Sequence, residues 1–121
     1  SKNVNPIASA SNFIWVTETL VYSEENGLDI DSVLETISGG AAGSWSLSNL
    51  APRVIKNDFS PGFFIKHFIK DISIAIDVCK SEGINLPGLE LAYAMYKTLE
   101  KRGLENEGTQ ALIKYYENIS V

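Results

Sequence analysis

Four polar residues near the N-terminus have spacings that place them on one face of a helix. Lys2, Asn5, Ser9 and Asn12 are separated by three, four and three residues, which is close to one helical turn each time. A lysine in a partly desolvated cleft has a lowered pKa and can donate or accept a proton, while a nearby amide orients a substrate oxygen. The alternative is a frayed terminal lysine followed by a helix-capping asparagine.

The segment from Gly39 to Asn49, GGAAGSWSLSN, interrupts a chain that otherwise has the apolar spacing of helices. Glycines destabilise a helix and leave backbone N–H groups open to a ligand or to close packing. Trp45 offers a flat apolar surface with one N–H donor, so we expect it to form a pocket wall. A phosphate-binding loop is not expected here, because the glycines follow a helix and lack the strand-turn-helix setting.

Lys66 and Lys70 are four residues apart, with His67 between them and Asp71 after them. Two cations on one helical face repel each other unless an anion is present, so they could contact a carboxylate or a phosphate. The alternative is a solvated face on which Asp71 is the local partner. His67 has no set of partners at metal-ligand spacing, so we expect no metal site and an interior histidine. Cys79 is expected to be a buried, inert thiol.

Composition limits the class of protein. A chain of 121 residues with 45% hydrophobic residues can build one domain around one core. Its net charge of −5 argues against binding to nucleic acids or anionic membranes, which requires clustered Lys and Arg. A single cysteine excludes an intramolecular disulfide and a cysteine-rich zinc site. With no long apolar run and no signal-peptide pattern, a cytoplasmic location is expected.

Apolar residues recur at helical spacing along the chain, and no segment alternates as a strand would, so we predict an all-α fold. Six helices are expected, from Asn5 to Asn26, from Asp29 to Gly39, from Ser46 to Ile55, from Phe64 to Ser81, from Pro87 to Gly103 and from Thr109 to Tyr116. The first is apolar on more than one face, which predicts a central helix and self-association.

The strings GGAAGSWSLSN, PGFFIKHFIKD and EGTQALIKYYE, in this order, resemble the C-terminal helical domain of the 3-hydroxyisobutyrate dehydrogenase family. These β-hydroxyacid dehydrogenases are related to 6-phosphogluconate dehydrogenase. The resemblance covers residues 1–121 and implies the 6-phosphogluconate dehydrogenase C-terminal domain-like fold. In the family this helical domain follows an N-terminal Rossmann domain, which binds NAD or NADP. The helical domain closes the active site and forms the dimer contact.

The resemblance also implies roles for individual residues. It makes Lys2 the catalytic lysine and Asn5 the asparagine that orients the substrate. Trp45 and Phe63 resemble the aromatic residues that line the substrate pocket. Lys70 resembles the lysine that reaches the cofactor or the substrate.

The chain departs from the family pattern at Pro6, where a polar residue is usual, and at Glu107, where an aspartate is usual. It also has no strand-borne GxGxxG motif. We therefore expect one domain of an enzyme that oxidises a short 3-hydroxy acid or reduces its semialdehyde, inactive without a Rossmann domain. Two alternatives stay open: a stand-alone helical dimerisation module without catalysis, and a helical carrier of small molecules.

Overall fold

The computed structural model describes residues 4–40 and 43–117. This part of the chain is helical and contains no strand, only an isolated antiparallel bridge between Phe64 and Gly108, so the all-α prediction is confirmed. The elements are α1 (Val4–Glu25), α2 (Ile30–Ser38), α3 (Trp45–Asn49), α4 (Ala51–Ile55), α5 (Ile65–Ser81), α6 (Pro87–Lys101), the 3-10 helix η1 (Thr109–Leu112) and α7 (Ile113–Tyr116).

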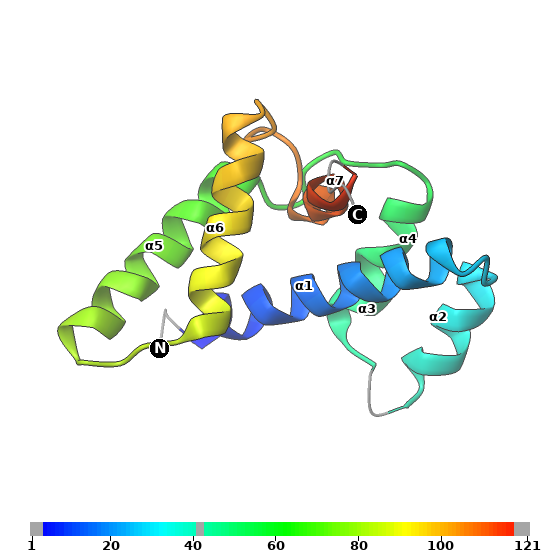
Figure 1. The fold of residues 1–121 in the computed structure, drawn as a ribbon, viewed down its shortest axis with the longest axis horizontal. Coiled ribbons are helices and arrows are strands. Elements are labelled where there is room, and N and C mark those ends of the chain that lie inside the picture. The colour runs from blue at the N-terminus through cyan, green and yellow to red at the C-terminus, as the bar shows by residue number, and fades with distance from the viewer. Residues whose placement is uncertain (1–3, 41–42, 118–121) are drawn as a thin grey trace.

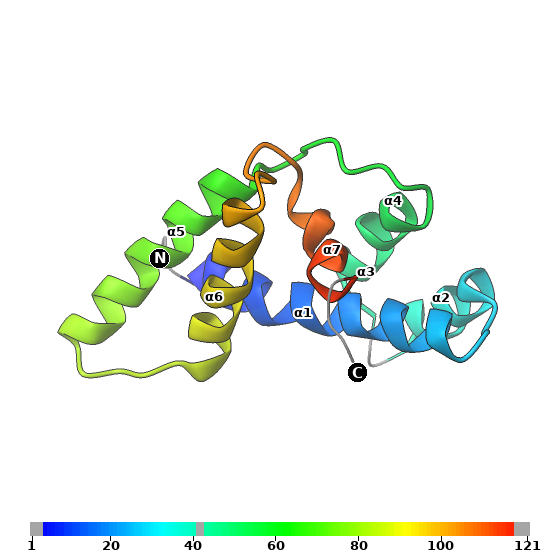
Figure 2. The same ribbon diagram turned by 45° about the horizontal axis from the view of Figure 1, so that its top comes forward.

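Helix α1 is the axis of the fold and contacts every other helix of the described chain. Helices α5 and α6 cross its N-terminal half, α2 to α4 pack on its C-terminal half, and α7 lies across its middle (Figures 1 and 2). The helix ends where Gly27 adopts a φ of 65° and the N–H of Leu28 donates to the carbonyl of Ser23 at 2.9 Å. The predicted central first helix is therefore confirmed.

The prediction of one helix from Ser46 to Ile55 is wrong in one respect, because this segment forms two short helices. Helix α3 ends before Leu50, and α4 begins at Ala51. The cause is Pro52, which has no N–H to donate to the carbonyl one turn earlier and so interrupts the helical hydrogen bonds. Asn57, with a φ of 56°, then ends α4 in the left-handed conformation.

Two hydrophobic clusters lie along α1. The larger joins the N-terminal half of α1 to α5, α6 and η1, and its buried members are Ala10, Ile65, Phe68, Ile69, Ile72, Ala75, Leu89, Ala92, Met95, Tyr96, Leu99, Ala111 and Leu112. The smaller joins the C-terminal half of α1 to α3 and α4 through Val16, Leu20, Leu47 and Ala51. Cys79 is a buried free thiol, as predicted.

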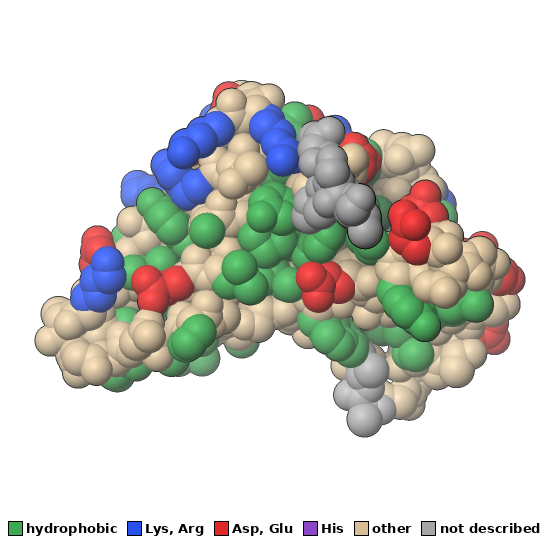
Figure 3. All heavy atoms as spheres, viewed as in Figure 1, with side chains coloured by type: hydrophobic (Ala, Val, Ile, Leu, Met, Phe, Trp, Pro, Cys, Tyr) green, Lys and Arg blue, Asp and Glu red, His purple; other side chains and the backbone are tan. Residues whose placement is uncertain are grey.

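On the surface, Lys and Arg side chains gather at the end of the molecule where α6 terminates, and acidic groups are spread over the rest of the face that Figure 3 shows. No helix among the described residues is long and apolar enough to cross a membrane. Those residues also contain no group of three or more His, Cys, Asp or Glu side chains that could hold a metal ion.

Candidate functional site

A cleft of about 720 Å³ opens between α1, the start of α3 and α5. Its walls come from separate parts of the chain, because its lining residues belong to α1, to the start of α3 and to α5 with the residues before it. The residues that line it are Asn5, Pro6, Ala8, Ser9, Asn12, Phe13, Ser44, Trp45, Ser46, Phe63, Phe68 and Asp71.

The α1 wall carries polar side chains at successive turns of the helix. Asn5, Ser9 and Asn12 all line the cleft. Asn5 is exposed at its rim, whereas Ser9 and Asn12 are half-buried. Lys2, the fourth member of the predicted polar stripe, lies outside the described residues. The spacing of about one helical turn therefore brings the hydrogen-bonding side chains of Asn5, Ser9 and Asn12 to one wall of the cleft.

The second wall is the start of α3, which Ser44 caps. The Ser44 side chain accepts a hydrogen bond from the N–H of Leu47 at 3.0 Å and donates one to Oδ1 of Asn12 at 3.2 Å. This pair links α3 to α1 and aims Trp45, which is 69% exposed, over the cleft. Gly43 permits the turn before the cap, since a Cβ there would lie 2.3 Å from the Ser38 carbonyl oxygen.

The third wall is aromatic and belongs to α5 and the residue pair before it. Phe63 lies at the lip, 41% exposed, with its ring edge-on to Phe68 at 5.9 Å between centroids. Phe68 forms the floor and contacts the rings of Phe13 at 5.3 Å and Tyr96 at 5.2 Å. Because Phe68 and Tyr96 belong to the larger cluster, Phe63 rests on the most densely packed part of the molecule.

Gln110 holds the loop that carries Phe63, a role that the sequence alone did not reveal. Its side-chain amide is 4% exposed and donates to the carbonyls of Asp58 at 3.0 Å and Ser60 at 2.9 Å. A Cβ at Gly108 would lie 2.2 Å from Oε1 of this amide, so a larger residue there would displace the Gln110 side chain. The one available signal was a glutamine directly before the three apolar residues 111–113, which is too weak to locate a contact across the fold.

The charged residues of α5 are divided between the cleft and solvent. Asp71 lines the cleft, whereas Lys70 is exposed and is absent from its described lining. Lys66 points elsewhere, with its Nζ 5.2 Å from the centroid of the Phe64 ring. The expected interior position of His67 is wrong. Its side chain is exposed, because its turn of α5 faces solvent, and its ring contacts Phe64 with 5.2 Å between centroids.

Glu107, which stands where the family usually has an aspartate, is not among the described residues of the cleft. Its carboxylate accepts a hydrogen bond from Nζ of Lys114 at 2.7 Å, and its backbone carbonyl accepts one from the N–H of Ile65 at 2.9 Å. Lys114 also lies over the Phe59 ring, 4.4 Å from its centroid. Glu107 therefore joins the C-terminal segment to the start of α5.

The arrangement suits a small polar molecule held against an aromatic surface. Amide and hydroxyl groups on α1 and α3 can bind a hydroxyl or carbonyl oxygen, and the rings of Trp45 and Phe63 can cover a flat or apolar part. Asp71 is the one charged side chain in the described lining. These described groups offer no cation to a phosphate or a pyrophosphate.

Residues 1–116 match the family model described as "NAD-binding of NADP-dependent 3-hydroxyisobutyrate dehydrogenase". The chain belongs to the 3-hydroxyisobutyrate dehydrogenase family. This is an oxidoreductase family, and the resemblance seen in the three sequence strings is confirmed. The match covers the whole described chain apart from its last residue, so α1 to α7 are all elements of the family's domain.

Relatives are found in bacteria and plants. The chain is 47% identical over 116 residues to an uncharacterized oxidoreductase of Bacillus subtilis, covering 96% of this chain and 40% of that protein. It is 42% identical over 120 residues to the Arabidopsis thaliana protein named "Probable 3-hydroxyisobutyrate dehydrogenase-like 1, mitochondrial", covering 99% of this chain and 36% of that protein. The chain thus spans about two fifths of the length of these relatives.

Solved structures show the same fold. The 3-hydroxyisobutyrate dehydrogenase of Salmonella typhimurium superimposes with a TM-score of 0.87 at 22% identity, over 93% of this chain and 40% of that one. The Mycobacterium tuberculosis 3-hydroxyisobutyrate dehydrogenase, solved with L-serine, gives a TM-score of 0.86 at 24% identity, over 95% of this chain and 42% of that one. The expected 6-phosphogluconate dehydrogenase-like helical domain is therefore confirmed as a fold.

Proposed function

We propose that this chain is the C-terminal helical domain of an NAD(P)-dependent β-hydroxyacid dehydrogenase that oxidises a short 3-hydroxy acid or reduces its semialdehyde. The observation that carries the proposal is that Asn5, Trp45 and Phe63, which come from three separate segments, line one cleft. The family match supports the reaction class. The lengths of the relatives support a larger protein whose Rossmann domain faces this cleft.

In this proposal the chain's own residues bind the substrate and move one proton. Asn5 donates a hydrogen bond to the substrate oxygen, and Trp45 and Phe63 exclude water from the reacting carbon. Lys2, which lies outside the described residues, takes the hydroxyl proton during oxidation and returns it during reduction. The bound nicotinamide supplies the hydride acceptor or donor.

In this proposal, two domains contribute to the cofactor-binding site. The described cleft has no cation for a pyrophosphate, so the Rossmann domain binds that group and selects NAD or NADP. Lys70, exposed beside the cleft on α5, is placed to reach the cofactor or the substrate from outside it.

Self-association stays a prediction, and it has support on α1. Trp15 and Tyr22 are seven residues apart, hence on one face of the helix, and are 40% and 65% exposed. Large apolar side chains exposed on a central helix are typical of a surface that a second copy covers. We propose a homodimer or a larger homo-oligomer on this basis.

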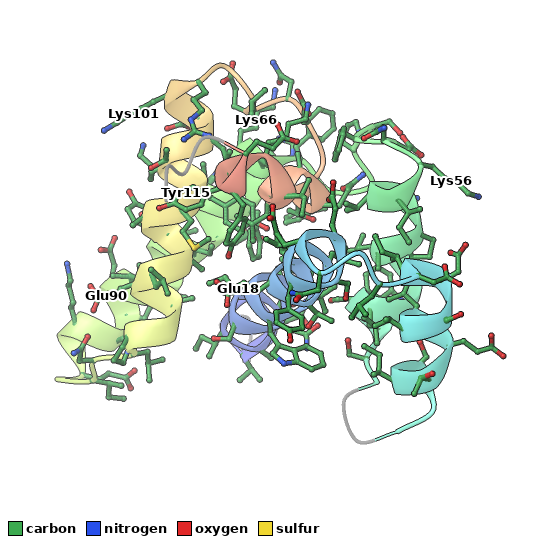
Figure 4. All side chains as sticks on the ribbon, turned by 45° about the vertical axis from the view of Figure 1, so that its right-hand side comes forward. Glu18, Lys56, Lys66, Glu90, Lys101 and Tyr115 are labelled. Atoms are coloured by element: carbon green, nitrogen blue, oxygen red, sulfur yellow. The ribbon has the colours of Figure 1, made fainter. Side chains whose placement is uncertain are left out.

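The test uses the full-length protein that carries this chain, assayed with NAD and NADP against a panel of short 3-hydroxy acids. Lys2→Ala is expected to lower kcat by about 10²–10⁴-fold, because the proton loses its relay. Trp45→Ala is expected to raise KM by weakening substrate binding. The matched control is Lys101→Ala, an exposed lysine at the end of α6 (labelled in Figure 4) that is not among the described lining residues of the cleft.

Unchanged turnover in Lys2→Ala, with the control also unchanged, would remove the proposed role of Lys2. Absence of hydride transfer to any of the acids, in a folded protein that still self-associates, would favour the interaction module. A ligand bound tightly without turnover would favour the carrier.

A further inference from the structure

A second cleft, of about 530 Å³, adjoins the candidate site. It shares the rings of Phe13, Trp45 and Phe63 with that site, so these three side chains separate the two spaces. Its other lining residues come from α3, α4, the loop before α5 and η1, and none of them lines the first cleft. They are Asn49, Leu50, Arg53, Gly62, Thr109 and Gln110.

Arg53 is the one charged side chain in the described lining of this second cleft. It is half-buried on α4. Its guanidinium packs against the backbone of Gly62, since a Cβ at that glycine would lie 3.2 Å from Nη1 of Arg53. The guanidinium thus lies against a position in the lining of the cleft that has no side chain.

No carboxylate of the described residues lies within 4.0 Å of the Arg53 guanidinium, and the ion pairs they do contain are Lys97–Glu100 and Lys114–Glu107. Asp58 is an acid whose pKa the Arg53 charge helps to lower, but the two side chains form no ion pair. Asp58 accepts hydrogen bonds from the side chain and N–H of Ser60, and these bonds are the main reason that its pKa is lowered, with Arg53 contributing less.

A half-buried guanidinium without an acidic partner stands out in a chain with net charge −5, where acids outnumber bases. The Gln110 amide donates to two loop carbonyls, and the Asn49 amide donates one N–H to the Trp45 carbonyl at 2.8 Å. Arg53 is the one cationic donor in the described lining, and its planar fork matches the two oxygens of a carboxylate.

We propose that this Arg53 cleft binds the carboxylate of a small organic acid with an apolar body. The carboxylate pairs with the Arg53 guanidinium, and the body lies against Leu50 and the rings of Trp45 and Phe63. A single cation among apolar walls suits one negative charge on an apolar molecule better than a doubly charged inorganic phosphate. The inference does not depend on the proposed dehydrogenase activity, because Arg53 and Leu50 line only the second cleft, although Trp45 and Phe63 line both.

Titration of the isotope-labelled 121-residue chain with phenylacetate, followed by ¹H–¹⁵N NMR at constant ionic strength, tests the proposal. The signals of the Trp45 indole and the Gly62 amide are expected to shift and saturate with a Kd of the order of millimolar. The indole of Trp15, which lines neither cleft, serves as an internal reference. Arg53→Met is expected to weaken binding at least about tenfold, since it removes the charged donor.

The matched control is Lys56→Met, which removes a cation from the end of the same helix. Lys56 is exposed and extends away from the molecule in Figure 4. This variant is expected to bind phenylacetate as the parent chain does. If Arg53→Met does not fold, Gly62→Ala provides the second test, because its Cβ would lie 3.2 Å from Nη1 and shift the guanidinium from its position on the Gly62 backbone, which should also weaken binding.

Three results would overturn the proposal. One is equal affinity for phenylacetate in the parent chain and in a folded Arg53→Met variant. If Arg53→Met does not fold, equal affinity in the parent chain and in Gly62→Ala has the same meaning. Another is equal affinity for 2-phenylethanol, which has a similar body and no charge, because it would show apolar binding alone. The third is stronger shifts with sodium phosphate than with phenylacetate, which would assign the cleft to phosphate.

Discussion

The two halves of α1 lie in unequal surroundings. Around its N-terminal half, α5, α6 and η1 bury thirteen residues in one cluster, whereas its C-terminal half shares a cluster of four with α3 and α4. Helix α2 has no buried residue at all. Most of the apolar surface removed from water therefore belongs to the α5–α6 half, and the α2–α4 half depends on α1 for its packing.

This inequality bears on the candidate site because its walls come from both halves. Phe63 rests on Phe68 in the larger cluster and its loop is held by Gln110. Trp45 stands on a helix of five residues attached to the smaller cluster. Segments with few buried contacts open at lower free energy, so we expect the Trp45 wall to move more readily than the Phe63 wall.

The largest expected effect comes from the larger cluster. Leu99→Ala removes a fully buried side chain and should lower the free energy of unfolding by about 2–5 kcal/mol. Leu34→Ala, on the half-buried face of α2, makes the same chemical change and should cost less than half as much. Urea unfolding of both variants measures the difference. Equal losses would show that the two halves are equally packed.

The second prediction concerns Tyr96, whose hydroxyl donates to the Thr109 carbonyl at 2.9 Å in the larger cluster. Tyr96→Phe leaves that buried carbonyl without its donor and should cost about 1–3 kcal/mol. Burial, with a smaller contribution from Tyr116, raises the pKa of Tyr96 well above its ordinary value of 10.0.

The Tyr96 phenol ionises at lower pH in the unfolded chain than in the folded chain, because its pKa is raised by folding. The stabilisation that the neutral phenol gives is therefore complete below pH 10 and is lost as the pH rises further. The parent chain should thus lose stability in alkali more steeply than Tyr96→Phe. Tyr116→Phe is the companion variant, since the pKa of Tyr116 is raised by burial and by its hydrogen bond to Glu18. Parallel alkaline profiles for parent and Tyr96→Phe would contradict the assignment.

The smallest effect is expected at the Trp45 wall. Ser44→Ala removes the cap of α3 and the bond to Asn12, and should cost about 1 kcal/mol. Its expected signature is local: faster hydrogen exchange in α3 and altered Trp45 fluorescence, with α5 and α6 unaffected. Ser44→Asp, which keeps a capping oxygen, should restore α3. If hydrogen exchange in Ser44→Ala accelerated equally in α6, the result would contradict the expectation that the Trp45 wall opens separately.

Much of the fold could be predicted because helix ends are decided locally. Pro87 begins α6, and Gly27, Gly83 and Gly103 adopt positive φ values just after α1, α5 and α6. The break between α3 and α4 was the exception. A proline at 52 signals an interruption, but where the chain resumes its helix depends on how Ala51 packs against α1.

The candidate site was predictable only in part. Asn5 and Trp45 were selected from the residues as well as from the family resemblance, and Phe63 from the resemblance alone. The structure places all three in one cleft, although their roles stay predictions. His67 was misplaced because helical spacing alone does not say which face of α5 turns inward. Gln110 and Arg53 were missed because each gains its meaning from a loop or glycine that is distant along the chain.

By itself, the sequence determined the family and the helices with their ends, apart from the break between α3 and α4, since helical periodicity, caps and family motifs are carried by neighbouring residues. The tertiary structure alone decided that the chain has two adjoining clefts separated by Phe13, Trp45 and Phe63. It also decided that a half-buried Arg53 faces the second of them. The physical reason is that a cleft is the space left between packed elements, so its shape and charge depend on contacts between residues far apart along the chain.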